Sequence, residues 1–175
     1  MDNNFKDISI RGRVAYCISC FENVLLYYGC NKEKWKFVLE QLWSFMNVEY
    51  VDDWFYQTAE ILPECILEDK YDKNSYEFID KRMFYELYQL YDSSCEVIKK
   101  IIRLIFELGS RELYGRIQGY SESTIEILEK VIQLCKKENI QLPDIADYKK
   151  YKFSINDGWG GDFEGRKLSK ILNNI

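Results

Sequence analysis

The chain has 175 residues, of which 47% are hydrophobic and 16% aromatic, and this is enough apolar material for the core of one domain. It carries 24 basic and 29 acidic residues and no histidine, so its net charge is −5. The lack of histidine excludes Ser-His-Asp and Cys-His nucleophile systems, and it also excludes zinc sites that use histidine.

The amino-terminal sequence MDNNFKDISI has no basic region followed by an apolar stretch. No segment approaches the roughly twenty apolar residues that cross a bilayer. We therefore expect a cytoplasmic protein that does not bind a membrane, with six reduced cysteines. Cys17 and Cys20 have C-x-x-C spacing, but no second close pair completes a metal site, so we interpret them as small buried groups.

Helical periodicity dominates the first third of the chain. Apolar residues recur at steps of three and four over 14–28, which predicts an amphipathic helix that stops at Gly29. Asn31 is expected to cap a second helix. A shorter third helix is expected over 54–62, and the short connections predict antiparallel neighbours.

Two long helices and a central one are expected later in the chain. The pattern over 75–91 predicts a helix, and the very apolar segment 97–108 predicts a central helix that ends at Gly109. Ser121 or Ser123 is then expected to cap a long helix. No alternating strand pattern and no repeat is present, so the sequence predicts one all-α domain over residues 1–175. It is either a compact multi-helix bundle or a short stack of antiparallel helix pairs.

The glycine-rich stretch NDGWGGDFEGRKLSKIL, residues 156–172, raises the question of a phosphate-binding loop. A P-loop needs Lys and Ser or Thr directly after its last glycine, but Arg166 and Lys167 follow Gly165 here. We therefore interpret residues 156–175 as a C-terminal clip. In this interpretation Trp159 fills a groove between helices, and an apolar tail of Leu168, Ile171 and Leu172 covers the surface beside it.

The segment 47–72 contains eight acidic residues and one basic residue, interleaved with aromatic residues. Such a segment repels a phosphate backbone and suits a basic protein surface, so we expect a protein partner and no nucleic acid. The predicted partner-binding residues are Glu49, Tyr50, Asp52, Asp53, Trp54, Tyr56, Glu60 and Glu64. The alternative is a solvated face whose acids pair with Arg11 and Arg13.

A carboxylate-dependent hydrolase or metalloenzyme is a further alternative, because Glu60 and Glu64 are four residues apart and two aspartates lie nearby. This spacing is common on solvated helix faces. We therefore expect no catalytic residue, no metal site and no cofactor.

Four segments, RGRVAYCISCFENVLLYYG, KWKFVLEQLW, EYVDDWFYQTAEILPECIL and DYKKYKFSINDGWGGDFEGRKLSKIL, resemble a family of small uncharacterised proteins of low-GC Gram-positive bacteria. We associate this family with the immunity proteins of polymorphic toxin systems. The resemblance covers nearly the whole chain and includes no catalytic signature. It implies a non-enzymatic inhibitor that neutralises a cognate toxin domain. A helical adaptor protein is a separate alternative for the function.

Overall fold

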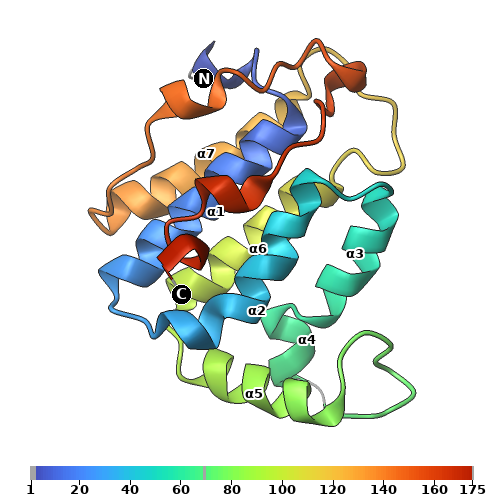
Figure 1. The fold of residues 1–175 in the computed structure, drawn as a ribbon, viewed down its shortest axis with the longest axis vertical. Coiled ribbons are helices and arrows are strands. Elements are labelled where there is room, and N and C mark those ends of the chain that lie inside the picture. Colours follow the sequence, from blue (N-terminus) through green and yellow to red (C-terminus); the bar gives the residue numbers. More distant parts are fainter. Residues whose placement is uncertain (1–2, 69, 175) are drawn as a thin grey trace.

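The protein consists of α-helices joined by loops and 3-10 turns (Figure 1). This computed structural model describes residues 3–68 and 70–174. The α-helices are α1 (Ile10–Tyr27), α2 (Lys32–Trp43), α3 (Val51–Glu60), α4 (Pro63–Glu68), α5 (Lys81–Asp92), α6 (Glu96–Ser110) and α7 (Glu122–Lys137). Within the described ranges, β structure is limited to an isolated bridge between Ile8 and Lys152. The prediction of an all-α protein is confirmed.

Helix α1 lies in the middle of the molecule, where it contacts α2, α6 and α7 (Figure 1). We expected this helix to be amphipathic, but its residues from Ile10 to Leu25 are all buried. The reason is that the C-terminal segment covers the face that the other helices leave open. The helices pack as a compact bundle around one continuous hydrophobic core, and not as a stack of pairs.

Helix α6 is the second central element, with α1, α3, α4 and α7 packed around it. It exposes only a narrow strip that includes Lys100 and Arg103, as predicted. The expectation that it ends at Gly109 is wrong, because the helix continues to Ser110. A Cβ atom at Gly109 would lie 2.9 Å from two atoms of the Trp54 ring. The glycine therefore allows α3 to approach α6 closely.

Short polar side chains cap some of the predicted helices, but not all of them. Asn31 caps α2, as predicted. The helix expected over 75–91 begins only at Lys81, because the Asp80 carboxylate caps it there. Ser121 precedes α7, but its side chain makes no capping hydrogen bond to the helix backbone.

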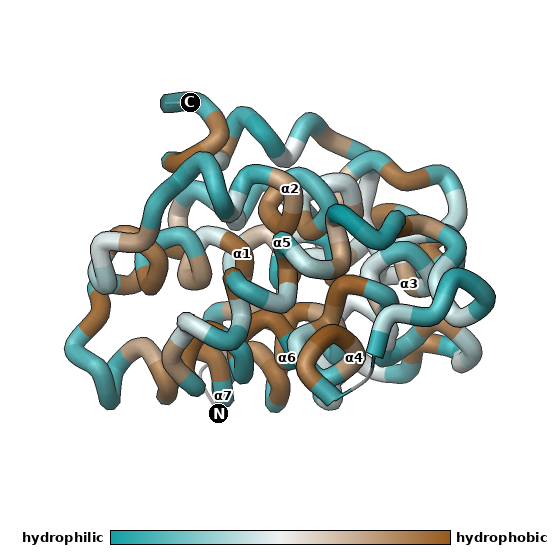
Figure 2. The backbone as a smooth tube through the Cα atoms, turned by 90° about the horizontal axis from the view of Figure 1, so that it is seen from below, coloured by the Kyte–Doolittle hydropathy of each residue, from teal (hydrophilic) through white to brown (hydrophobic). Residues whose placement is uncertain are grey.

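None of the described helices is both long and apolar enough to cross a membrane. Figure 2 shows hydrophobic and hydrophilic residues alternating along most of the helical turns. This alternation is typical of helices that turn one face toward a protein core.

Arg13 is a buried cation that joins the N-terminal segment to the start of α7. Its guanidinium donates hydrogen bonds to the main-chain oxygens of Phe5, Lys6, Tyr120 and Ser121 and to the hydroxyl of Thr124. Burial lowers the pKa of Arg13 to about 10, and the charges of Glu122 and Glu112 oppose this shift. The side chain therefore stays charged at neutral pH, and its charge is stabilised mainly by carbonyl dipoles.

The C-terminal segment is anchored by the buried carboxylate of Glu22 on α1. This carboxylate accepts hydrogen bonds from the Trp43 indole, the Ser169 hydroxyl and the main-chain N–H groups of Lys170 and Ile171. Ile171 and Leu172 are buried, as predicted. The expectation for Trp159 is wrong, because its ring is only half-buried and lines a surface cleft instead of filling a groove between helices.

None of the six cysteines forms a disulfide bond within the described residues. Cys17 and Cys20 of the C-x-x-C pair are buried on α1, and burial raises the pKa of each thiol. A raised pKa makes a thiol a poor nucleophile and a poor metal ligand at neutral pH. This environment supports the interpretation of the pair as core residues.

Buried tyrosines should make the fold sensitive to alkali. Burial raises the pKa of Tyr16, Tyr91 and Tyr148 above the ordinary value of 10.0. The unfolded chain then loses protons that the folded protein retains, so the free energy of unfolding should fall as the pH rises above about 10. An alkaline titration that follows tyrosinate absorbance and circular dichroism together shows whether tyrosine ionisation and loss of helix coincide. Ionisation of every tyrosine near pH 10 with the helices intact would contradict it.

Candidate protein-binding surface

Helix α3 places part of the predicted site on the outside of the protein. Tyr50 precedes the helix, and Asp52 and Asp53 lie in its first turn, where negative charge is favourable at a helix N-terminus. Tyr56 lies one turn after Asp52 on the same face. The side chains of Tyr50 and Tyr56 are 59% and 54% exposed, so both rings are available for contact.

Trp54 must be removed from the predicted site, because it is a core residue with 1% exposure. Its indole N–H donates to the main-chain oxygen of Gln41 at 3.0 Å. Its ring packs against those of Phe45 and Phe106, with centroids 4.7 and 5.9 Å away. Trp54 therefore fixes α3 to the bundle, and it offers no surface to a partner.

Tyr114 is a surface residue that the sequence analysis missed. It lies in the loop between α6 and α7 and is 77% exposed. Its ring centroid lies 6.5 Å from that of Phe55 on α3. The neighbouring Tyr56 side chain is the main reason that the pKa of Tyr114 is raised. The sequence signals its exposure only through its position in a loop, because loops run over the protein surface.

We call Glu49, Tyr50, Asp52, Asp53, Tyr56 and Tyr114 the acidic aromatic surface. Among the described residues, none forms an ion pair with Glu49, Asp52 or Asp53. The three carboxylates therefore keep their charge available for an external partner.

Glu60 and Glu64, which were also predicted to bind a partner, make contacts within the chain instead. The Glu60 carboxylate accepts hydrogen bonds from three successive main-chain N–H groups, those of Glu77, Phe78 and Ile79. Glu64 forms an ion pair with Arg103 on α6. Both side chains thus hold the fold together, and we leave them out of the acidic aromatic surface. Asp69, another acid of this segment, lies outside the described residues.

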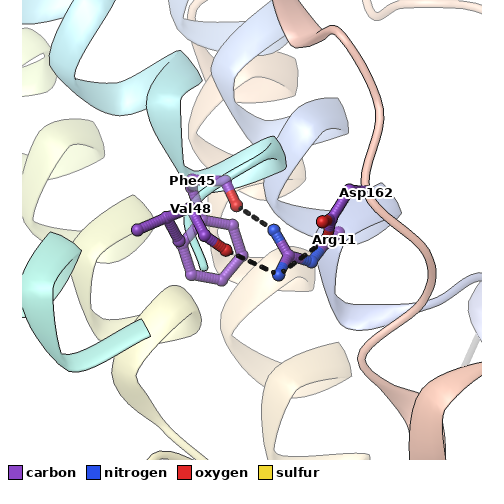
Figure 3. Close-up of polar contacts among 4 residues, drawn as sticks. All are labelled: Arg11, Phe45, Val48 and Asp162. Carbon is purple, nitrogen blue, oxygen red and sulfur yellow. Dashed lines mark hydrogen bonds and ion pairs between the residues drawn. The ribbon is translucent and has the colours of Figure 1, made fainter. Parts of the chain in front are cut away.

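The alternative that Arg11 and Arg13 neutralise the acids is wrong. Figure 3 shows the Arg11 guanidinium donating to the main-chain oxygens of Phe45 and Val48, at 2.6 and 3.1 Å. It also pairs with Asp162 of the C-terminal loop at 3.1 Å. Burial lowers the pKa of Arg11, and Asp162 opposes this shift. The buried Arg11 guanidinium therefore stabilises the turn before Glu49 through these hydrogen bonds.

The structure does not bring the predicted carboxylates together as a pair with open access. Glu60 and Glu64 are each bound elsewhere, and Asp52 and Asp53 point from the start of α3 to solvent. Within residues 3–68 and 70–174, no three or more histidine, cysteine, aspartate or glutamate side chains form a group that could hold a metal ion.

In comparisons with protein-family models, curated proteins and solved structures, none matches the chain.

Proposed function

We propose that this protein is a non-enzymatic, immunity-type inhibitor that binds a cognate toxin domain through the acidic aromatic surface. The observation that carries the proposal is the exposure of Tyr50, Tyr56 and Tyr114 beside carboxylates that have no ion pair among the described residues. Tyrosine is enriched among the residues that dominate binding energy at protein interfaces. The resemblance to immunity proteins supports the same reading.

The two kinds of side chain on this surface have different roles in binding. Carboxylates attract a basic partner over a distance and so raise the association rate. Salt screens the charges, so this increase in rate becomes smaller at high salt. Tyrosine rings lose water on contact and slow dissociation. A partner with a basic surface, such as a nuclease toxin domain, has the complementary charge.

Charge reversal should separate these roles. We expect the double variant Asp52→Lys/Asp53→Lys to associate at least about tenfold more slowly with the toxin at low salt and to lose most of the salt dependence. We expect Tyr114→Ala to dissociate about thirtyfold faster, which corresponds to about 2 kcal/mol. If a toxin domain is encoded next to the gene, stopped-flow or surface-based kinetics with that domain measures both rates. Cell survival during co-expression measures neutralisation.

A matched control carries the same change in net charge at another place. Asp92 and Glu126 are exposed on α5 and α7, so Asp92→Lys/Glu126→Lys should associate nearly as fast as the parent protein. Thermal stability is measured on the same samples, because reversing charges in the first turn of α3 also weakens that helix. If the folded Asp52→Lys/Asp53→Lys variant neutralises the toxin as well as the parent does, the proposed interface is wrong.

A further inference from the structure

A cleft of about 720 Å³ lies beside the acidic aromatic surface. One wall is the loop between α6 and α7, with Gly115, Arg116 and Ile117, directly after Tyr114. The other wall is the glycine-rich part of the C-terminal segment, from Phe153 to Trp159. In Figure 1 these walls are the yellow loop that follows α6 and the orange-red segment near the start of α1.

The cleft contains polar side chains of both charges that the fold does not use. Arg116 and Asp157 are exposed and line opposite walls. Among the described residues, neither has an ion pair or a side-chain hydrogen bond, and the indole N–H of Trp159 has no hydrogen-bond partner there either. The cleft therefore offers a free guanidinium on one wall, and a free carboxylate and a free indole N–H on the other.

Aromatic rings form the apolar part of the same cleft. Phe153 and Trp159 are both half-buried, and the Arg13 guanidinium lies 4.9 Å from the centre of the Phe153 ring. Gly158 keeps Phe153 in place, because a Cβ atom there would lie 2.7 Å from the ring and its φ of +97° disfavours other residues. The Phe153 ring is thus packed against both Arg13 and Gly158.

We propose that this cleft binds an extended segment of the partner polypeptide. A main chain presents carbonyl oxygens, which Arg116 and the Trp159 indole can bind, and N–H groups, which Asp157 can bind. Its side chains can pack on the two rings, as in other modes of peptide recognition. This inference rests on the proposed function, because the segment belongs to the partner that contacts Tyr114 at the edge of the cleft.

The mixed charge of the walls disfavours other occupants. A phosphate group or a nucleotide would gain from Arg116 but would be repelled by Asp157. The same glycine-rich segment also lacks the P-loop arrangement of Lys and Ser or Thr. A polypeptide main chain presents both donors and acceptors, and Arg116, Asp157 and the Trp159 indole offer partners for both.

The test uses a random hexapeptide library displayed on phage and panned against the full chain. Binding of enriched peptides is then followed by tryptophan fluorescence, because Trp35, Trp43 and Trp54 are buried and Trp159 reports on the cleft. We expect the peptides to change the Trp159 emission. They should bind at least about tenfold more weakly to Arg116→Ala, because this variant loses a charged hydrogen bond. Arg111→Ala, an exposed arginine in the same connection, should bind them as the parent does.

The outcomes separate the cleft from the acidic aromatic surface. Failure to enrich any peptide, or enriched peptides that bind Arg116→Ala as tightly as the parent, would overturn the cleft proposal. Peptides that lose binding only in Asp52→Lys/Asp53→Lys would overturn the cleft and support the surface. Peptides that need Arg116, combined with full toxin neutralisation by Asp52→Lys/Asp53→Lys, would support the cleft and overturn the surface.

Discussion

Replacing Trp54 with alanine should lower the free energy of unfolding by about 3–5 kcal/mol, because removal of a large buried ring leaves a cavity. The ring fills the contact between α3 and α6, where Gly109 lies against it, and its indole N–H satisfies the Gln41 carbonyl. Chemical denaturation of parent and variant measures the difference. The variant should also lose helical signal from α3 first, since no other aromatic residue of α3 is fully buried.

Tyr56→Ala is the matched control on the same helix. Its ring is 54% exposed, so we expect a stability change below about 1 kcal/mol together with weaker binding of the toxin. Trp54→Ala should therefore mainly lower the stability, whereas Tyr56→Ala should mainly weaken toxin binding. If Trp54→Ala were as stable as the parent and Tyr56→Ala were strongly destabilised, the orientation of α3 would be wrong.

Replacing Glu22 with glutamine should cost about 3 kcal/mol and release the end of the chain. The carboxylate accepts bonds from Lys170 and Ile171 N–H groups, at 2.6 and 3.3 Å, and glutamine places an NH₂ group against one set of donors. Hydrogen bonds to a charged acceptor each contribute about 1.5–3 kcal/mol, and a buried donor left without a partner adds its desolvation cost. Denaturation measures the loss of stability.

Hydrogen exchange locates the effect of Glu22→Gln within the chain. Amides of residues 169–172 should exchange faster than in the parent, while those of α6 should change only as global stability changes. Glu126→Gln, an exposed glutamate on α7, serves as the control and should change neither quantity measurably. Unchanged exchange at residues 169–172 in Glu22→Gln would mean that another contact holds the C-terminal segment.

The sequence predicts those elements whose pattern is strong and local. The helix over 97–108 is recognisable because eight of its twelve residues are apolar and recur at helical spacing. Asn31 is recognisable as a cap because the next residues are strongly helical. The acids of 47–72 could also be found from composition alone. In each of these cases, one short segment contains the whole signal.

The rest depends on contacts between segments that are distant in the sequence. Helix α3 carries aromatic residues on both faces, so periodicity alone does not show that Trp54 turns inward and Tyr56 outward. Tyr114 joins the surface only because α6 ends beside α3. Arg11 pairs with Asp162 and not with the acids of 47–72, which are nearer in the sequence, because the C-terminal loop folds back over the start of α1.

The most direct test of the proposed interface is hydrogen–deuterium exchange of the protein, alone and in complex with the toxin. We expect slower exchange in the complex at residues 49–56 and 112–116, because contact with the acidic aromatic surface excludes water there. Helix α5, which carries the exposed Tyr85 and Tyr88, should exchange at the same rate in both states. Protection of α5 with unchanged exchange at residues 49–56 would contradict the account.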